Sequence, residues 1–283
     1  MGAYQVCPVA KMEKLLLSTD RSEFSEGAIR EAINLAKTCG SKLYVISVAE
    51  VPDFLFLDSL PPAAETLEME TREHLESVKE RVENEGLTCE IIQRRGGEPY
   101  KYIVDEAAKN NVEMLIMGRR GRTGVMRLMM GSVTARTIGH APCKVMVVPR
   151  AAKLTFERIL IATDGSIYSE LASREAISIA KGIGSSLIVL SVAKRDENLP
   201  VAKESVDMVK KVAEREGIEV EALTLKGEPY EVIINTAEQK NAGLIAVGWH
   251  GRTGMERLLM GSVTERVIGH ARGAVLVIKK AVV

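Results

Sequence analysis

The feature that most constrains the fold of this sequence is an internal repeat centred on two glycine-rich stretches. Gly118 to Ser132 reads GRRGRTGVMRLMMGS, and Gly248 to Ser262 reads GWHGRTGMERLLMGS. Each stretch follows a short apolar run and precedes a helix-like segment, an order that brings backbone N–H groups close to a phosphate group. Two copies at matched positions therefore predict two phosphate-binding loops. The alternative interpretation is that the glycines only form a tight turn.

The repeat extends over almost the whole chain of 283 residues. Lys14 to Ser18 (KLLLS) matches Arg158 to Ala162 (RILIA) at an offset of 144 residues, whereas the two GEPY blocks match at an offset of 130. The first half therefore contains 14 extra residues, which we expect in Val51 to Pro62. The apolar run Phe54 to Leu57 in this insert either packs in the core, forms a dimer contact or covers a pocket.

Within each half, apolar runs of strand length alternate with segments whose apolar residues have helical spacing. Continuous apolar runs such as Leu43 to Val48 are typical of parallel strands buried on both faces. The order β-α-β-α-β-α-β-α-β predicts an α/β fold with a five-stranded, parallel, doubly wound sheet of the Rossmann-like kind in each half. We expect two tandem domains, residues 1–150 and 151–283, that lie against each other because the connection between them is short.

The charge balance and hydropathy of the chain exclude several classes of function. Lysine plus arginine equals aspartate plus glutamate at 38 each, so no global charge attracts nucleic acid or an anionic membrane. No apolar run approaches the roughly 18 residues that span a bilayer. The four arginines between Arg119 and Arg127 could indicate RNA binding, but no aromatic side chains stand among them to stack on bases. We expect a soluble, cytoplasmic protein that binds neither nucleic acid nor membranes.

The cysteines and histidines do not form a recognisable metal or catalytic pattern. No C-x-x-C pair is present, and all four cysteines lie in the first half: Cys7, Cys39, Cys89 and Cys143. We interpret them as buried or incidental thiols, because a disulfide framework or a zinc site would use paired spacings. His140 and His270 each follow a glycine and lack partners for a catalytic triad, so we expect structural roles at helix ends.

The sequence also indicates where a ligand would bind. In an open parallel sheet, ligands bind beyond the carboxyl ends of the strands, where the strand order reverses. The ends of the first and fourth strands of each half bring an aspartate, Asp20 or Asp164, to the glycine loop. Glycines let the backbone approach a ligand closely, and Ser132 and Ser262 add hydroxyl donors at a helix N-terminus. An alternative role for the aspartates is helix N-capping.

These motifs resemble a known family. The Thr-Asp-(Gly)-Ser sequence after the first strand, the G-x-x-G-x9-G-S loop and the Ser-Val-Thr that follows resemble the universal stress proteins of the ATP-binding kind, here as two tandem copies. The resemblance implies a flavodoxin-like sheet with strand order 3-2-1-4-5 and a bound adenine nucleotide, ATP, ADP or AMP, with Mg²⁺ as a candidate companion.

The resemblance also implies roles for individual residues. Asp20 and the backbone of Val48 would face the adenine and ribose, as would Asp164 and Val192 in the second half. The residues that would hold the ribose and phosphates are Gly118, Gly121, Gly131, Ser132 and Val133 in the first half, and Gly248, Gly251, Gly261, Ser262 and Val263 in the second.

Family members commonly pair through their last strands. The resemblance therefore implies that Val145 to Val148 meets Val275 to Ile278 within one chain, and it allows a homodimer as a further assembly.

The two copies differ around the shared glycines. Arg21 stands where the second half has Gly165, and we expect a solvated arginine there in preference to a phosphate contact. Arg122 and Arg252 are shared by the two loops and either approach a phosphate or lie exposed.

The pattern as a whole favours a binding module whose adenine-nucleotide ligand changes its conformation or its contacts with partners. A slow ATPase or phosphotransferase is the second hypothesis. We expect no strong catalysis, because no general base, arginine finger or Walker lysine stands beside the loop. An interaction scaffold whose pockets stay empty is the third hypothesis.

Overall fold

The computed structural model describes residues 7–8, 12–50, 62–121, 130–252 and 260–279, and it contains the same succession of elements twice. The strands of the first half are β1 (Lys14–Ser18), β2 (Lys42–Ala49), β3 (Cys89–Arg95), β4 (Met114–Gly118) and β5 (Lys144–Val148). Its helices are the short η1 (Glu23–Ser25), α1 (Glu26–Cys39), α2 (Pro62–Glu83), α3 (Pro99–Lys109) and α4 (Ser132–His140).

The second half repeats this order after a short connection. Its strands are β6 (Arg158–Ala162), β7 (Ser186–Ala193), β8 (Val220–Lys226), β9 (Leu244–Gly248) and β10 (Ala274–Ile278). Its helices are α5 (Ile167–Ile183), the short η3 (Asp196–Asn198), α6 (Leu199–Arg215), α7 (Pro229–Gln239) and α8 (Ser262–His270). None of the helices in the described ranges is both long enough and apolar enough to cross a membrane.

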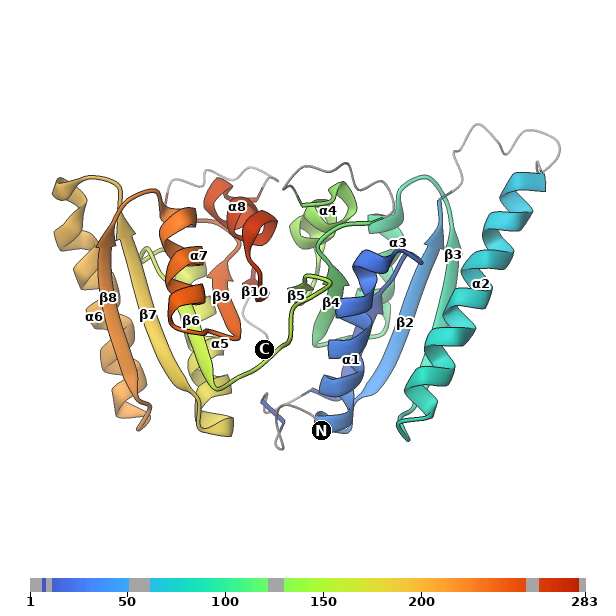
Figure 1. Ribbon diagram of the computed structural model, residues 1–283, viewed down its shortest axis with the longest axis horizontal. Coiled ribbons are helices and arrows are strands. Elements are labelled where there is room, and N and C mark those ends of the chain that lie inside the picture. The colour runs from blue at the N-terminus through green and yellow to red at the C-terminus, as the bar shows by residue number, and fades with distance from the viewer. Residues whose placement is uncertain (1–6, 9–11, 51–61, 122–129, 253–259, 280–283) are drawn as a thin grey trace.

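The strands form one sheet of ten, in the order β3-β2-β1-β4-β5-β10-β9-β6-β7-β8. Strands within each half are parallel, and the predicted order 3-2-1-4-5 is confirmed. The halves meet where β5 and β10 pair in antiparallel fashion, with Met146 opposite Leu276. Figure 1 shows α4 and α8 near the middle of the molecule and α2 and α6 at its two ends.

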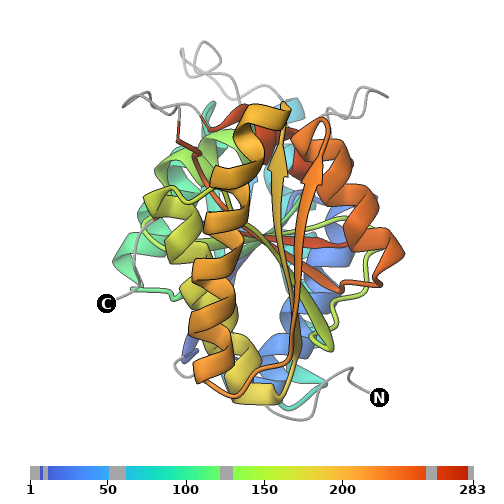
Figure 2. The same ribbon diagram turned by 90° about the vertical axis from the view of Figure 1, so that its left-hand side faces the viewer.

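Helices cover both faces of this sheet, as the view along it in Figure 2 shows. Alternate residues of each strand enter different cores, as a period of two requires. On β1, for example, Leu15 and Leu17 pack in the core that includes α1 and α2, whereas Leu16 packs in the core that includes α3 and α4. Each core continues into the second half, so the two halves share their apolar layers.

The strand register locates the length difference between the halves more closely. Leu43 pairs with Cys89 in the first half and Leu187 with Val220 in the second, which gives an offset of 131 residues at β3. The offset becomes 130 at Pro99, the first residue of α3. One of the 14 extra residues therefore lies in the turn between β3 and α3, and the others lie between β2 and β3. Residues 51–61, with the apolar run Phe54 to Leu57, lie outside the described residues.

The helix ends follow the sequence signals with one difference. Gly40 and Gly184 end α1 and α5 in the left-handed conformation, with φ of 65° and 74°. Ser166 caps α5, its hydroxyl oxygen accepting a hydrogen bond from the Ser169 N–H. Ser22, which occupies the place of Ser166 in the first half, instead precedes η1, and α1 begins only at Glu26.

Candidate functional site

The aspartate after the first strand of each half is held by backbone N–H groups. Asp20 Oδ1 accepts hydrogen bonds from the Ser22 N–H (3.2 Å) and hydroxyl (2.7 Å). Asp164 Oδ1 accepts from the Ser166 N–H (3.0 Å), while its Oδ2 accepts from the Arg252 N–H (2.9 Å). In the second half the carboxylate therefore joins its own loop to the glycine loop, a larger role than the helix capping that we considered as an alternative.

The second glycine of each G-x-x-G pair is required by this aspartate. A Cβ atom on Gly121 would lie 2.6 Å from Asp20 Oδ2, and a Cβ atom on Gly251 would lie 2.6 Å from Asp164 Oδ2. Any side chain at these positions would push the carboxylate away. The glycines therefore permit the contact between the end of the first strand and the loop after the fourth strand, which the sheet order makes neighbours.

The last glycine of each loop starts the following helix. The Gly131 N–H donates to Arg119 O (2.9 Å), and the Gly261 N–H donates to Trp249 O (3.0 Å), so that each loop closes on itself. The hydroxyl of Thr134 donates to Gly118 O at 3.1 Å, which fixes α4 to the end of β4. Thr264 makes the same bond in the second half. The sequence motif contained these threonines, but its spacing did not reveal this anchoring role.

The first turns of α4 and α8 offer unpaired donors to the space above the sheet. Backbone N–H groups in the first turn of a helix have no partner within that helix, and the helix dipole places partial positive charge there. Ser132 and Ser262 occupy the first position of each helix, and no side chain of the described residues caps either end. Both ends are therefore suited to bind an anion.

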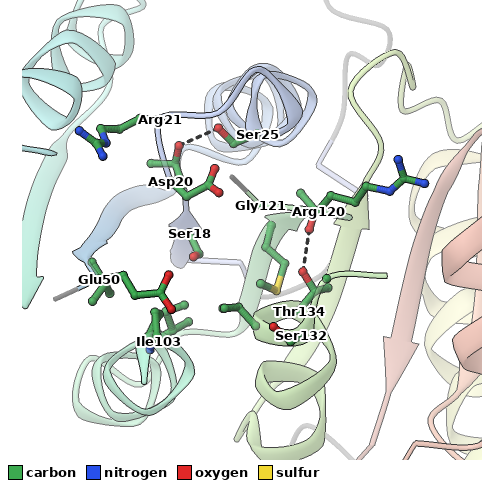
Figure 3. Close-up of a pocket in the computed structure, with 17 residues that line it drawn as sticks. Ser18, Asp20, Arg21, Ser25, Glu50, Ile103, Arg120, Gly121, Ser132 and Thr134 are labelled. Carbon is green, nitrogen blue, oxygen red and sulfur yellow. Dashed lines mark hydrogen bonds between the residues drawn. The ribbon is translucent and has the colours of Figure 1, made fainter. Parts of the chain in front are cut away.

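A cavity of about 100 Å³ lies beside these groups in the first half. All seven residues that the sequence predicts for this half line it: Asp20, Val48, Gly118, Gly121, Gly131, Ser132 and Val133. Figure 3 shows Asp20 and Glu50 on one side of the cavity and Ser132 with Thr134 on the other. Pro99 and Ile103 of α3 complete the wall.

The corresponding cavity of the second half is larger, about 740 Å³. The seven predicted residues of this half also line it together: Asp164, Val192, Gly248, Gly251, Gly261, Ser262 and Val263. Lys194, Asn198 and Val201, which the sequence prediction did not include, contribute to its wall. They follow the end of β7, a part of the chain that no motif marked.

Arg21 differs from the sequence expectation. It has φ of 67°, close to the 74° of its counterpart Gly165, so the first half keeps the left-handed conformation without glycine. The Arg21 guanidinium forms an ion pair with Glu70 of α2, and only 14% of its side chain is exposed. It is therefore a paired arginine and not a solvated one, and Figure 3 shows it turned away from the cavity.

A histidine missed by the sequence interpretation lies behind the first cavity. His74 Nε2 is 2.8 Å from Thr19 Oγ1, whose hydroxyl donates to Ser25 Oγ. Burial holds the pKa of His74 below its ordinary value. Ser205 takes the equivalent place in the second half at the offset of 131, and its Oγ accepts from Arg252 Nη2 (3.3 Å).

The two loops are linked to the opposite half of the molecule, the first directly and the second through a lysine. Arg119 Nη1 donates to Ala271 O (2.9 Å), just beyond the end of α8. Lys279, after β10, donates to Gly139 O of α4 and lies 4.5 Å above the ring of Trp249. Arg119 of the first glycine loop thus contacts the second half directly, whereas Trp249 of the second loop is linked to α4 of the first half through Lys279, a residue of its own half.

The paired histidines lie at helix ends, as expected. His140 and His270 end α4 and α8, opposite the ends that line the cavities. In each, Nδ1 is 2.8 Å from a carbonyl oxygen one turn earlier, that of Arg136 or Arg266.

The cysteines differ from the sequence expectation. Cys7 and Cys39 form a disulfide with a Cα–Cα distance of 4.5 Å, which joins the segment before β1 to the end of α1. Spacing alone could not reveal this pair, because the two residues are separated by 32 positions without a repeated pattern. Cys89 and Cys143 are free, and burial raises their pKa values to about 11 and about 12.

These raised pKa values predict slow thiol labelling. At pH 8, iodoacetamide should modify Cys89 and Cys143 at least ~100-fold more slowly in the folded protein than in the unfolded chain, because the thiolate is the reactive form. Mass spectrometry of timed samples measures the rate. The chain unfolded without reductant is the control and should expose two thiols, rising to four after reduction. Rapid labelling of the folded protein would contradict the burial of these thiols.

Comparisons with known proteins agree on one family. The sequence model of the universal stress protein family matches residues 11–149 and 155–279. A universal stress protein of Methanocaldococcus jannaschii is 38% identical over 141 residues, which cover 44% of this chain and 83% of the relative. One from Synechocystis is 25% identical over 282 residues, covering 91% and 96%. The crystal structure of a universal stress protein from Archaeoglobus fulgidus has the same fold, with a TM-score of 0.74, 24% identity and coverage of 94% and 98%.

Proposed function

Because this chain belongs to the universal stress protein family, we propose that it is a stress-response module that binds an adenine nucleotide in each half. One observation carries the proposal. Each half has its own cavity, and in each the wall includes an aspartate, a glycine loop and an uncapped helix N-terminus. We take residues 1–150 and 151–283 as the two binding units.

The proposed ligand is ATP or AMP, with Mg²⁺ accompanying ATP. Asp20 and the backbone of Val48 would contact the adenine and ribose, and the N–H groups at Ser132 and Val133 would contact phosphate oxygens. A hydrogen bond to a charged group contributes about 1.5–3 kcal/mol, and the helix dipole contributes about 0.3–1 kcal/mol more. A few such contacts are enough for micromolar affinity.

The proposal includes a route by which the ligand changes the protein. In each half the aspartate lies against the glycine loop, so a ligand that binds to the aspartate also acts on the loop. A shift of the loop would change the contacts that link it to the opposite half. Arg119 of the first loop is bonded to Ala271 after α8, and Lys279 connects Trp249 of the second loop with α4. We propose that nucleotide binding at the two sites alters the seam between the halves, the region where β5 pairs with β10 and where these contacts lie. This change would alter the surface to which partner proteins bind.

Substituting both helix-start glycines tests the proposal. The Gly131→Val, Gly261→Val double variant should weaken ATP and AMP binding at least ~10-fold, because the valine side chains enter the space of the phosphate and cost at least one hydrogen bond to a charged oxygen. Isothermal titration measures affinity and the number of sites. Mass spectrometry of small molecules released from purified protein identifies the resident ligand.

Gly182→Ala is the matched control, since an added Cβ there would meet Pro8 O only at 3.7 Å, outside both cavities. Absence of any heat change or binding with ATP, ADP and AMP in the wild-type protein would contradict the proposal and favour an empty scaffold. Single-turnover hydrolysis of labelled ATP, faster in the wild type than in the double variant, would favour the ATPase hypothesis.

A further inference from the structure

The two cavities carry opposite charges at one equivalent position. Glu50 directly follows β2 and Lys194 directly follows β7, and each lines its cavity. The backbone around them is the same: Ala49 O accepts from the Gly96 N–H at 3.1 Å, and Ala193 O accepts from the Gly227 N–H at 3.0 Å. The residue before each charged side chain is therefore held by the same backbone hydrogen bond in both halves. At this equivalent position the two sites differ by two units of formal charge.

In the first cavity the carboxylates face the ligand space. Figure 3 shows the carboxylate of Glu50 pointing into the cavity, while the guanidinium groups of Arg21 and Arg120 point away from it. Arg21 is already paired with Glu70. Within the described part of the chain, no cation forms an ion pair with Glu50. This side of the first cavity thus presents the carboxylates of Asp20 and Glu50 to the ligand space.

In the second cavity cations line the same space. Lys194 Nζ lies 3.6 Å from Glu228 Oε2, a loose contact in which 60% of the lysine side chain stays exposed. Arg252 places Nη2 against Gly165, where an added Cβ would be 2.5 Å away, and bonds to Ser205. Among the described residues of the wall, Asp164 is the one carboxylate, and it accepts backbone N–H groups with both oxygens.

We propose that Glu50 and Lys194 determine how much phosphate charge each site accepts. The first site prefers an adenine ligand with one phosphate or none, and the second prefers the triphosphate. This inference rests on the proposed nucleotide binding. Its physical basis is Coulombic interaction across the cavity: unit charges about 8 Å apart interact by about 0.5 kcal/mol in water, and ATP carries two more phosphates than AMP, so ATP is repelled more by Glu50 and attracted more by Lys194.

The test separates the two sites and exchanges the charges. Gly261→Val leaves the first site, and Gly131→Val leaves the second. Isothermal titration of each protein with adenosine, AMP and ATP in EDTA gives the ratio of the ATP and AMP dissociation constants, with adenosine as the uncharged reference. The ratio should favour AMP at the first site and ATP at the second. Glu50→Lys should shift it about tenfold toward ATP, and Lys194→Glu about tenfold toward AMP.

Glu50→Gln and Lys194→Gln are the neutral controls and should each give about half of the shift on a logarithmic scale. If the ratio of the ATP and AMP dissociation constants is the same at both sites and neither Glu50→Lys nor Lys194→Glu changes it, the inference is overturned. The proposal that both sites bind nucleotides would be unaffected by that result. In a second titration with Mg²⁺ in place of EDTA, a preference of the first site for ATP that requires Glu50 would also overturn it, because the carboxylate would then be a metal ligand. Failure of all three ligands to bind either site would instead remove the proposed function.

Discussion

Replacing Glu175 with alanine should lower the free energy of unfolding by about 3–5 kcal/mol. Glu175 lies on α5 of the second half, and its Oε1 is 2.5 Å from Nζ of Lys144 on β5 of the first half. Only 2% of the lysine side chain is exposed, so the substitution would leave a buried ammonium group without its carboxylate. Urea denaturation monitored by circular dichroism measures the loss.

Glu170→Ala on the same helix is the matched control. Glu170 pairs with Arg174 one turn away, but both side chains are more than half exposed, and exposed pairs of this kind contribute about 0.3–0.5 kcal/mol. The Lys144→Met, Glu175→Leu double variant should recover most of the lost stability, because apolar residues often replace a buried pair without cost. A loss for Glu175→Ala no larger than that of the control would show that the pair does not stabilise the seam.

The elements that position the two cavities were predictable because their signals are local. Short continuous apolar runs identified β1 and β4, and the rule for doubly wound sheets made them neighbours. This adjacency alone brings Asp20 to Gly121, although the two residues are far apart in sequence. The repeat then gave the second copy. Predictions of this kind depend on spacing and on topology, not on the conformations of side chains.

The contacts made by α2 were not predictable for a physical reason. The second half has Gly165 in the place of Arg21 and Ser205 in the place of His74, so the repeat carried no signal for either contact. Arg21 and Glu70 are 49 residues apart and Thr19 and His74 are 55 residues apart, so no local pattern indicated that they would meet. Arg21 lines the first cavity, so its pairing with Glu70 is one of the features in which that cavity differs from the second.

The path of the N-terminal segment is another feature set by tertiary packing. Cys7 meets Cys39 because the segment before β1 returns to the end of α1, where Pro8 O also approaches Gly182 of α5. Cysteine spacing carries no information about such a return. When cysteines do not follow a repeated spacing pattern, their disulfide pairing can be identified only from the three-dimensional structure.

Two glycines, Gly27 and Gly243, lie against the connection between the halves, and replacing either with alanine should destabilise the protein. Ala152, Leu154 and Phe156 of this connection are buried, each with at most 4% exposed. A Cβ atom on Gly243 would lie 2.9 Å from the carbonyl carbon of Thr155 and closer still to its oxygen. Backbone atoms cannot rotate away, so Gly243→Ala should cost about 3 kcal/mol, the upper end of the usual range for overpacking.

Gly27→Ala should act in the same way at the start of the connection. Its Cβ would lie 2.9 Å from Arg150 O and closer to Pro149 O, although alanine is otherwise the better helix former in α1. Gly182→Ala in α5 isolates the helix preference, because its Cβ meets no atom closer than 3.7 Å, and it should be neutral or stabilising by up to about 1 kcal/mol. Thermal and urea unfolding of the three variants measure the difference. If the free energies of unfolding of Gly27→Ala and Gly243→Ala equal that of Gly182→Ala, the connection can move to accommodate a methyl group. It would then not hold the two halves rigidly against each other.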